Sequence, residues 1–421
     1  TDFMEVLVVG GGGREHAICY ALKKNKDITK IYCAPGNGGI SDIAECLPDI
    51  KATDLDGILE FVKAHPGISM TVVAPDDPLA LGLVDLLNEN GFRAFGPTKD
   101  AAQIEASKVF SKNLMKKYGI PTADYQVFDD ARSAKEYLKT AEYPIVVKAD
   151  GLALGKGVII CKDKKEATKA VNEIMLDHKF GKSGNQIVIE EFLTGYEVSV
   201  LAFCDGKTIL PMVTSQDHKR ALDNDQGLNT GGMGAFSPSQ RFGETEMKKA
   251  YNDIFLPTLG ALCSEGITFK GVLYFGLMVS DKGVKVLEYN ARFGDPETQA
   301  VLVRLENDLY DIFNKVIDQK LSQVKLKWKD RTSICVIIAS GGYPEAYEKG
   351  YEIEFGDIDD DCVVFHSGTV KKDGKYYTNG GRVLGVTCMG KNLAEAREKA
   401  YANVKKISFK DMHYRTDIGV K

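Results

Sequence analysis

The clearest chemical signal is a lysine inside an apolar strand that runs into a glycine-rich loop. The segment reads Ile145-Val-Val-Lys-Ala-Asp-Gly151 and continues to the loop Gly155-Lys156-Gly157. Burying the ammonium group of Lys148 in such a strand is costly unless an anion meets it. The backbone N–H groups of the loop are unobstructed by side chains, which suits polyphosphate oxygens. The segment therefore indicates phosphate binding; the alternative is an ordinary hairpin whose lysine reaches solvent.

A group of carboxylates lies where one expected strand ends and the next begins. Glu190 and Glu191 close the first strand, and Glu197 opens the second. Carboxylates placed there can accept hydrogen bonds from an adenine amino group and from ribose hydroxyls. The alternative is that these glutamates are simply solvated at a strand end.

A third group has the donor set of a magnesium site. Glu288 and Asn290 are two residues apart and therefore share one face of a strand. Magnesium that also holds phosphates takes oxygen donors of this kind. Arg292 follows immediately and is suited to bidentate contact with a phosphoryl group, and Asp295 and Glu297 add further charge. The metal-free alternative is a polar stripe that faces solvent.

The elements that must position these residues begin with an N-terminal region in which strands and helices alternate. Strands are expected at 5–9, 30–34 and 70–74, and a glycine- or proline-rich loop follows each. In a doubly wound parallel sheet such loops gather at the edge where ligands bind. The glycines at 10–13 would seat a sugar phosphate at a helix N-terminus. A dinucleotide-binding dehydrogenase is disfavoured, because Glu15 replaces the third glycine of that motif.

The remaining elements are expected to form α+β units. A connecting helix is expected at 108–118, followed by strand–loop–strand at 143–161 and a helix at 164–176. Further expected elements are strands within 186–203, a hairpin around Asp281-Lys282-Gly283, and helices at 297–305, 310–321 and 393–407. The region after residue 328 shows no chemistry of its own and is expected to pack against the nucleotide-binding unit.

Composition limits the class of protein. With 421 residues the chain exceeds one hydrophobic core, so several domains are expected. A net charge of -5 without a basic arm argues against a nucleic-acid partner. The nine cysteines are scattered and form no CxxC pair, which predicts reduced thiols, a cytoplasmic setting and no zinc site. Apolar runs of strand length predict no membrane span.

Taken together and in this order, these segments resemble the ATP-grasp superfamily, in which two α+β units close on ATP. Within it the chain resembles the phosphoribosylamine–glycine ligase (glycinamide ribonucleotide synthetase) family over nearly its whole length. The segments that carry the resemblance are Gly10-Gly-Gly-Gly-Arg-Glu-His16, Ala34-Pro-Gly-Asn-Gly-Gly39, Phe95-Gly-Pro-Thr98, Lys148-Ala-Asp-Gly151, Ser215-Gln-Asp-His-Lys-Arg220, Asn229-Thr-Gly-Gly-Met-Gly234 and Glu288-Tyr-Asn-Ala-Arg-Phe-Gly-Asp-Pro-Glu297.

The resemblance implies a multidomain fold of the α/β and α+β classes. The implied units are an N-terminal doubly wound parallel sheet for substrate (1–103), an ATP-grasp central domain (104–123 and 195–327), its lid subdomain (124–194) and a small C-terminal α+β domain (328–421). It also implies ATP as co-substrate, Mg²⁺ or Mn²⁺, and the small-molecule substrates glycine and 5-phosphoribosylamine. No nucleic-acid or membrane partner is expected, and a monomer is favoured over an oligomer.

The resemblance also implies roles for individual residues. The ATP-binding set is Lys108, Lys148, Gly155, Lys156, Gly157, Glu190, Glu191, Leu193 (through its backbone) and Glu197, and the metal ligands are Glu288 and Asn290. The substrate-binding set is Gly12, Arg14, Glu15, Asn37, Gly38, Asp76, Asp217, Lys219, Thr230, Gly231, Gly232, Met233, Gly234, Arg292 and Asp295. Catalytic roles fall to Lys148 and Arg292, which would offset charge on the transferred phosphoryl group, and to Asp217 as a candidate base. Arg292 could instead hold the 5′-phosphate of the substrate.

Two positions depart from the family's pattern. Asp76 stands where the family commonly has a glutamate, and Gly276 stands near the place where many ATP-grasp enzymes have another acidic metal ligand. The implied reaction is attack of the glycine carboxylate on the γ-phosphate of ATP, then attack of the amine on glycyl phosphate, with water excluded by lid closure. The alternatives are an ATP-grasp ligase that carboxylates or formylates a purine intermediate, and a non-catalytic nucleotide sensor.

Overall fold

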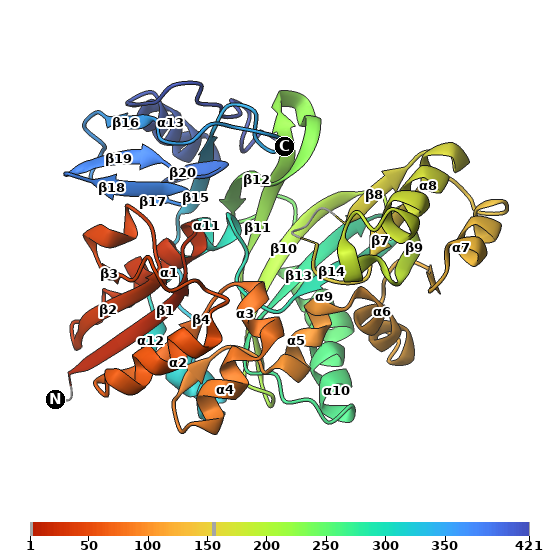
Figure 1. Ribbon diagram of the computed structural model, residues 1–421, viewed down its shortest axis with the longest axis horizontal. Coiled ribbons are helices and arrows are strands. Elements are labelled where there is room, and N and C mark those ends of the chain that lie inside the picture. The colour runs from red at the N-terminus through yellow and green to blue at the C-terminus, as the bar shows by residue number, and fades with distance from the viewer. Residues whose placement is uncertain (1–2, 154–156, 421) are drawn as a thin grey trace.

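The computed structural model describes residues 3–153 and 157–420, and its N-terminal region is a parallel sheet in the order β3-β2-β1-β4-β5 (Figure 1). The strands are β1 (Met4–Gly10), β2 (Ile28–Pro35), β3 (Glu45–Cys46), β4 (Ile68–Val73) and β5 (Ala94–Phe95), and the helices are α1 (Gly13–Leu22), α2 (Leu55–Ala64), α3 (Asp76–Leu81) and α4 (Leu83–Glu89). Alternate residues of β1 pack into two different cores, Leu7 with α2 and Val8 with α1, because both faces are covered. The predicted doubly wound sheet is confirmed.

A larger sheet connects the central part of the chain with its C-terminal region. Its order is β14-β13-β10-β11-β12-β15-β20-β17. The strands are β10 (Tyr196–Cys204), β11 (Ile209–Leu222), β12 (Gln226–Ser237), β13 (Gly271–Ser280), β14 (Gly283–Asn290), β15 (Thr332–Ala339), β17 (Cys362–His366) and β20 (Arg382–Gly390). Strands β12 and β15 pair from Gly234 to Ser237. The C-terminal region therefore shares a sheet with the central one, whereas the sequence predicted only packing between them.

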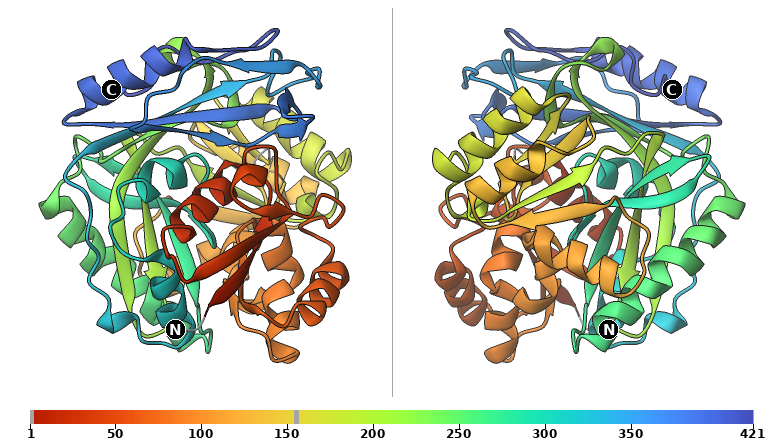
Figure 2. Two further views of the ribbon diagram at one scale, coloured as in Figure 1. Left: turned by 90° about the vertical axis from the view of Figure 1, so that its left-hand side faces the viewer. Right: turned by 90° about the vertical axis from the view of Figure 1, so that its right-hand side faces the viewer.

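Helices cover this sheet and connect it with its neighbours. They are α9 (Glu244–Ala250), α10 (Leu256–Ser264), α11 (Glu297–Leu302), α12 (Leu309–Ile317) and α13 (Leu393–Val404). A small sheet in the order β18-β19-β16-β21 completes the C-terminal region, with β16 (Glu352–Phe355), β18 (Thr369–Lys372), β19 (Lys375–Thr378) and β21 (Ile407–Ser408). Figure 2 shows the C-terminal strands lying over α1, which β17 contacts.

The fourth sheet stands away from the main body in Figure 1 and is called the lid unit here. The lid unit consists of β6 (Tyr125–Phe128), β7 (Ile145–Ala149), β8 (Val158–Cys161) and β9 (Ile187–Glu191), in the order β6-β9-β7-β8, with α7 (Ala131–Leu138) and α8 (Lys164–Val171). It has its own hydrophobic core, which includes Leu138, Val147 and Val171. Helices α5 (Lys99–Ala106) and α6 (Lys108–Lys117) lead into it.

The hairpin of β11 and β12 was not predicted from the sequence. Strand β12 contains four glycines, at 227, 231, 232 and 234, and glycine disfavours strands because it has no side chain to pack. Pairing with β11 on one side and β15 on the other supplies what local propensity lacks. Helices α9 and α10 were also missed. Within the part of the chain that the structure describes, no helix is long and apolar enough to span a membrane.

One disulfide contradicts the prediction of reduced thiols. Cys362 and Cys388 lie opposite each other on β17 and β20, and their sulfurs are bonded. The two residues are 26 positions apart in sequence, so the scattered spacing of the cysteines gave no sign of the pair. Strand register, which composition does not reveal, brings them together.

Candidate active site

The lysine in the apolar strand meets an anion, as its burial requires. Lys148 lies in β7, and its Nζ forms an ion pair with Glu190 Oε1 of β9 at 2.6 Å. The side chains are 12% and 4% exposed, respectively. Glu190 is thus committed to a lysine in this structure. Phosphate binding by Lys148 and adenosine binding by Glu190 stay predictions.

A second buried lysine, which the sequence analysis missed, lies on the other side of Glu190. Lys112 Nζ is 3.5 Å from Glu190 Oε2 and donates to Thr122 Oγ1 at 2.7 Å and to the Ala123 carbonyl at 2.9 Å. Burial lowers the pKa of Lys112 to about 8, against the opposing effect of Glu190. Lys112 lies one helical turn after Lys108, so the sequence could have indicated that both lysines share a face of the helix. Glu190 therefore bridges two lysines.

The predicted phosphate lysines Lys108 and Lys148 come together at the entrance to the lid unit. Lys108 begins α6, and its Nζ donates to the Gly151 carbonyl at 3.1 Å. Burial lowers the pKa of Lys108, and Lys148 adds to this shift. Asp150 Oδ1 accepts from Ser107 Oγ at 3.0 Å and from the Val109 N–H at 2.9 Å, which fixes the start of α6 to the end of β7.

The glycine loop of the lid lies only partly within the described residues. Gly155 and Lys156 fall outside them. A Cβ on Gly157 would lie 3.0 Å from the Cβ atoms of Ala149 and Ala153, so a larger residue would crowd the turn after β7. The predicted role of this loop in phosphate binding stays a prediction.

The connection between the lid unit and the large sheet carries the other predicted adenosine contacts. Glu191 Oε1 accepts from the Asp124 N–H at 3.1 Å and lies 3.6 Å from Lys285 Nζ. Leu193 is half-buried in the connection, and Glu197 is exposed at the start of β10. The structure thus gathers these residues along one short crossing between two sheets, and adenosine binding there stays a prediction.

The predicted metal ligands lie on β14 and fit a divalent cation chemically. Burial alone would raise the pKa of Glu288, but nearby Lys219, followed by other cations, outweighs burial and lowers it, so the carboxylate is ionised. The side chain of Glu288 is 41% exposed. A Cβ on Gly276 of β13 would lie 3.0 Å from Glu288 Cγ. A side chain at position 276 would therefore compete with Glu288 for space.

A cluster of titratable side chains adjoins β14, the strand that carries the predicted metal ligands. Asp217, followed by Glu288, raises the pKa of Lys219 well above its usual range. Burial and then Asp217 raise the pKa of Glu297 to about 7. Tyr274 Oη, which also pairs with Ser199 Oγ at 2.7 Å, donates to Glu297 Oε1 at 3.1 Å. Glu297 therefore holds a proton part of the time near neutral pH, a property the sequence did not indicate.

The glycine-rich part of β12 lies against the C-terminal region. Thr230 Oγ1 donates to the Lys219 carbonyl at 2.7 Å and accepts from the Gly232 N–H at 3.0 Å, while the Gly231 N–H donates to Tyr343 Oη at 3.0 Å. Met233 is fully buried in the C-terminal core. A Cβ on Gly234 would lie 2.7 Å from Ile418 Cγ2. The side chain of Met233 and the space beside Gly234 are thus enclosed in the protein, so any substrate contact by these two residues would be made through the backbone.

The loop after β14 leads from the metal strand to α1. Arg292 NH2 lies 3.1 Å from Glu105 Oε2. Three residues later, Asp295 Oδ2 accepts from the Arg14 N–H at 3.2 Å. Arg14 Nε donates to the Phe293 carbonyl at 2.7 Å. Arg14 therefore holds this loop against the N-terminal sheet.

The first turn of α1 is organised by the carboxylate of Glu15. Glu15 Oε1 accepts from the Gly12 N–H at 2.8 Å, and Glu15 Oε2 pairs with Arg14 at 3.2 Å. A Cβ on Gly10, which has a positive φ of 128°, would lie 2.4 Å from Glu15 Cγ. Glycine at this position lets the carboxylate fold back over the loop. Substrate contacts by Gly12, Arg14 and Glu15 stay predictions.

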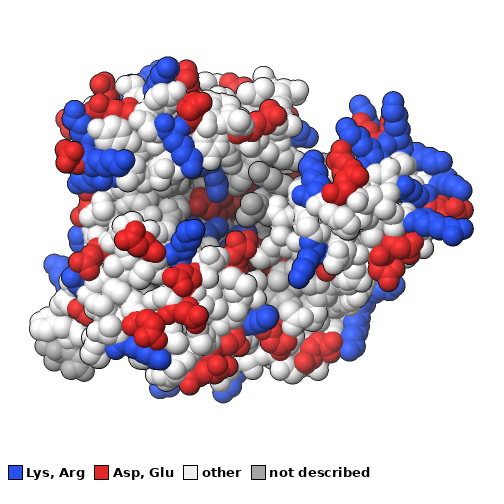
Figure 3. Space-filling model, in the orientation of Figure 1, with Lys and Arg blue, Asp and Glu red and all other residues white. Residues whose placement is uncertain are grey.

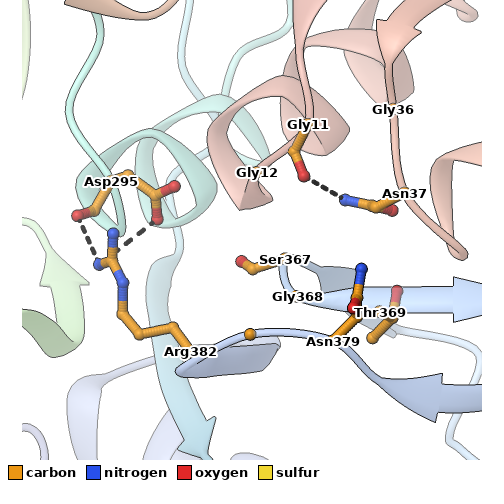
Figure 4. A pocket seen from close by; sticks show the side chains of 11 residues that line it. Gly11, Gly12, Gly36, Asn37, Asp295, Ser367, Gly368, Thr369, Asn379 and Arg382 are labelled. Carbon is orange, nitrogen blue, oxygen red and sulfur yellow. Dashed lines mark hydrogen bonds and ion pairs between the residues drawn. The ribbon is translucent and has the colours of Figure 1, made fainter. Parts of the chain in front are cut away.

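Between the glycine loop and the C-terminal region lies a cavity of about 340 Å³ (Figure 4). It is lined by Gly11, Gly12, Gly36, Asn37, Asp295, Ser367, Gly368, Thr369, Asn379, Gly380 and Arg382. More than half of these residues follow residue 328, where the sequence analysis assigned no chemistry. The arginine after the glycine turn at 380–381 was the available signal. Figure 3 shows the hollow on this face, with acidic and basic side chains in its wall.

Arg382 connects the cavity with the glycine-rich strand. Its NH1 donates to the Asp295 carbonyl at 2.9 Å and to the Gly232 carbonyl at 3.4 Å, and it lies 3.7 Å from Asp295 Oδ1. Burial alone would lower the pKa of Arg382, but Asp295 outweighs it and raises the pKa. A permanent cation from the C-terminal region therefore lies between the cavity and β12.

Two further predicted substrate residues lie at this cavity or beside it, and a third lies elsewhere. Asn37 Nδ2 donates to the Gly11 carbonyl at 3.0 Å and to the His366 carbonyl at 2.8 Å. The Gly38 N–H donates to the Thr369 carbonyl at 3.1 Å. Asp76 begins α3 and acts on the charges of Arg292 and Glu105, so it lies near these two residues rather than in the wall of the cavity.

Comparison with known proteins agrees over the whole length of the chain. Three family profiles match consecutive segments: the phosphoribosylglycinamide synthetase N domain (residues 4–105), its ATP-grasp (A) domain (106–298) and its C domain (333–421). The phosphoribosylamine–glycine ligase of Caldanaerobacter subterraneus subsp. tengcongensis is 46% identical over 415 residues, covering 99% of both chains. That of Synechocystis sp. is 47% identical over 423 residues, covering 99% of this chain and 100% of the relative.

Solved structures give the same result. The phosphoribosylamine–glycine ligase of Thermotoga maritima superposes with a TM-score of 0.84 at 34% identity, covering 99% of this chain and 100% of that one. Biotin carboxylase from Campylobacter jejuni, at a TM-score of 0.76 and 13% identity, shares the fold over 99% of this chain and 94% of its own. Matching profiles, sequence identity and architecture together show that the chain belongs to the phosphoribosylglycinamide synthetase family.

Proposed function

We infer that the chain is an ATP-dependent ligase that joins glycine to 5-phosphoribosylamine, giving glycinamide ribonucleotide, ADP and phosphate in purine biosynthesis. The relatives that match along the full chain are phosphoribosylamine–glycine ligases. The ATP-grasp architecture supports the use of ATP and a divalent metal. Glycine, the amine and ATP are all small molecules, which suits a cavity of the size found beside the glycine loop.

The observation that carries this proposal is the course of the loop from Arg292 to Glu297. Its first residue follows the candidate metal strand, and Asp295 lines the cavity at the glycine loop. One short loop therefore connects a phosphoryl-transfer centre with a cavity for a second substrate. A ligase that makes a reactive acyl phosphate needs this adjacency, because the intermediate must meet the amine before water does.

In the first step the glycine carboxylate attacks the γ-phosphorus of ATP, forming glycyl phosphate and releasing ADP. The charges of Lys148, Arg292 and Lys108 all act on Glu288, and these three cations would stabilise the equatorial oxygens of the transferred group. Glu288 and Asn290 would hold the divalent metal, Mg²⁺ or Mn²⁺, which supplies charge neutralisation on the phosphates. Lys148 would then exchange part of its contact with Glu190 for the nucleotide.

In the second step the neutral amine of phosphoribosylamine attacks the acyl carbon, phosphate leaves, and the amine loses a proton. We place the ribose phosphate in the cavity between the glycine loop and the C-terminal region. Its volume of about 340 Å³ is in the range of small-molecule sites. The α1 N-terminus and Arg382 favour an anion there. Asp217 stays the candidate proton acceptor.

The division into an N-terminal substrate domain (1–103), an ATP-grasp central domain (104–123 and 195–327), a lid (124–194) and a C-terminal domain (328–421) is part of this proposal. The separate sheets support it, although β12 and β15 cross the last boundary. We further propose that a single copy of the chain is active.

The test is ADP release from ATP, Mg²⁺ and glycine, with and without freshly generated phosphoribosylamine. Amine-dependent turnover that requires glycine is the expected result. Turnover with bicarbonate or formate in place of glycine would keep the nucleotide site and overturn the substrate assignment. An absence of turnover with every carboxylate, together with tight ATP binding, would indicate a nucleotide sensor and overturn the ligase.

A further inference from the structure

One buried carboxylate outside the predicted site contacts three consecutive residues of the phosphoryl-transfer centre. Glu105 is near the end of α5, and its side chain is 8% exposed. Its Oε1 accepts from the Ala291 N–H at 2.8 Å, and its Oε2 lies 3.1 Å from Arg292 NH2. Asn290 is the third contact. Glu105 thus reaches the metal strand and the loop after it from a different helix.

The contact with Asn290 determines which way its amide faces. With its oxygen at this corner, the Asn290 amide accepts from Arg292 NH2 at 3.4 Å. With its nitrogen there instead, the amide donates to Glu105 Oε2 and to the Tyr289 carbonyl at 3.1 and 3.3 Å, so it satisfies two acceptors in place of one donor. The carboxylate of Glu105 offers acceptor oxygens to its neighbours and pairs with the Arg292 guanidinium, so it favours the nitrogen branch of the amide. The oxygen branch is then turned away from Glu105. A metal ligand needs this orientation, because the amide oxygen is the donor atom.

The same carboxylate restrains the arginine. Arg292 NH2 contacts Glu105, while Arg292 NH1 donates to the Phe293 carbonyl at 3.3 Å, so the guanidinium is fixed on two sides. The side chain of Arg292 is 17% exposed. A buried ion pair contributes little net stability compared with an apolar pair. Its value here is geometric: it holds a cation in one place beside the metal strand.

The chain position of Glu105 adds a link to the nucleotide lysines. Helix α5 ends at Ala106, Ser107 caps α6, and Lys108 is the first residue of α6. Contacts between α5 and β14 hold this corner against the metal strand. The junction between α5 and α6 therefore places Glu105 beside the predicted metal ligands and Lys108 beside the lid unit.

We propose that Glu105 is a positioning residue for phosphoryl transfer, which orients the Asn290 amide oxygen toward the metal and holds the Arg292 guanidinium beside the transferred group. The proposal rests on the function proposed above, because it takes Asn290 and Arg292 in those roles. A purely structural Glu105 would affect folding alone. A positioning Glu105 affects metal affinity through Asn290.

The experiment measures Mn²⁺ binding to the enzyme–ADP complex by electron paramagnetic resonance, alongside steady-state kinetics. Glu105→Gln keeps the shape and an acceptor for the Ala291 N–H, but its NH₂ faces the amide of Asn290. We expect Mn²⁺ affinity and kcat each to fall by about 10-fold or more, as for other partners of metal ligands, with an unchanged KM for phosphoribosylamine. Asp100→Asn, on the exposed first turn of the same helix, is the matched control and should match the wild type.

A double variant tests the orientation directly. In Glu105→Gln with Asn290→Asp, the glutamine NH₂ can donate to the new carboxylate, so the hydrogen bond is restored with reversed polarity. We expect the double variant to recover most of the Mn²⁺ affinity lost in Glu105→Gln, and the two substitutions to be non-additive. Additive effects on Mn²⁺ affinity would overturn the positioning role.

The outcomes separate this proposal from the function on which it rests. If Asn290→Ala weakens Mn²⁺ binding but Glu105→Gln binds Mn²⁺ within about twofold of the wild type, the positioning role is wrong and the metal site stands. If Asn290→Ala has no effect, the metal site itself is wrong. Should Glu105→Gln fail to fold, Glu105→Asp keeps the charge but withdraws the carboxylate from both Asn290 and Arg292, which the longer side chain reaches through one oxygen. That variant is expected to lose Mn²⁺ affinity, and wild-type affinity would refute the proposal.

Discussion

His16 couples the helix behind the glycine loop to the C-terminal region, and this contact makes a quantitative prediction about pH. The ring is 6% exposed, and its Nδ1 accepts from the His366 N–H at 2.8 Å. Burial, followed by His366, lowers the pKa of His16 from 6.5 to about 3, with Asp42 opposing the shift. The folded state therefore binds fewer protons than the unfolded state. The protein is therefore most stable with respect to His16 above pH 6.5, where the imidazole is neutral in both states. It loses stability as the pH falls toward 3, because the unfolded state takes up the proton first.

The magnitude follows from these values. Each pKa unit corresponds to about 1.4 kcal/mol, so charging the unfolded-state imidazole costs the protein about 2 kcal/mol between pH 7 and pH 5. His16→Asn retains an acceptor for the His366 N–H but does not titrate. The variant is expected to be less stable than the wild type at pH 7, and the difference should shrink by about 2 kcal/mol at pH 5. Glu297 titrates in both proteins, so its contribution cancels.

The assay is urea unfolding at both pH values, followed by the fluorescence of Trp328, the single tryptophan. Ile18→Val, on the same helix and fully buried, is the control. It removes a methylene group without a titratable atom, so its cost of about 1 kcal/mol should be the same at both pH values. A difference between wild type and His16→Asn that changes by less than about 0.5 kcal/mol would refute the reasoning, since the cited shift requires a larger change.

Three further predictions concern the site. Lys148→Ala should lower ADP formation by about 10³-fold, because a preorganised cation near the phosphoryl oxygens is lost; near-normal turnover in a coupled assay would contradict the assignment. Arg382→Ala should raise the KM for phosphoribosylamine by about 10- to 100-fold, the usual cost of losing a charged contact in a ligand site, while the KM for ATP changes little; the reverse pattern would place Arg382 at the nucleotide instead. The pKa of Glu297 is raised from 4.5 to about 7, so this residue destabilises the folded state increasingly as the pH rises from 4.5 through 7. Glu297→Gln should therefore gain about 2 kcal/mol relative to the wild type between pH 5 and pH 8, and urea unfolding that shows a constant difference would rule this out.

Much of the fold could be predicted because local patterns and tertiary structure agree. The expected apolar runs bounded by glycine or proline are all strands in the structure. They are the strand that contains Lys148, the strand after its loop, the hairpin around Asp281 to Gly283 and the first parallel strands. The hairpin of β11 and β12 could not be predicted, because its local pattern and its tertiary structure disagree. Its glycines disfavour a strand locally, and only the neighbouring strands on each side stabilise it.

The candidate site divides in the same way. Motif residues such as Lys148, Glu288 and Arg292 could be identified because their types are unusual in apolar or strand surroundings. Lys112 and Glu105 could not, since a lysine or glutamate on a helix is ordinary in sequence and becomes unusual only when the structure buries it. Arg382 was missed because its partner Asp295 lies 87 positions away and in another region of the fold.

The shared sheet has a consequence for the evolution and handling of this protein. Strand β12 finds its outer partner, β15, only beyond residue 327, and Met233 and Phe236 of β12 belong to the C-terminal core. A fragment that ended at residue 327 would expose an unpaired strand edge and these two apolar side chains, a combination that promotes aggregation. The C-terminal region is therefore required for the central region to fold into a soluble unit. Gene truncations or fusions at this boundary should yield insoluble chains, whereas insertions in the exposed turn after β11 leave the shared edge intact.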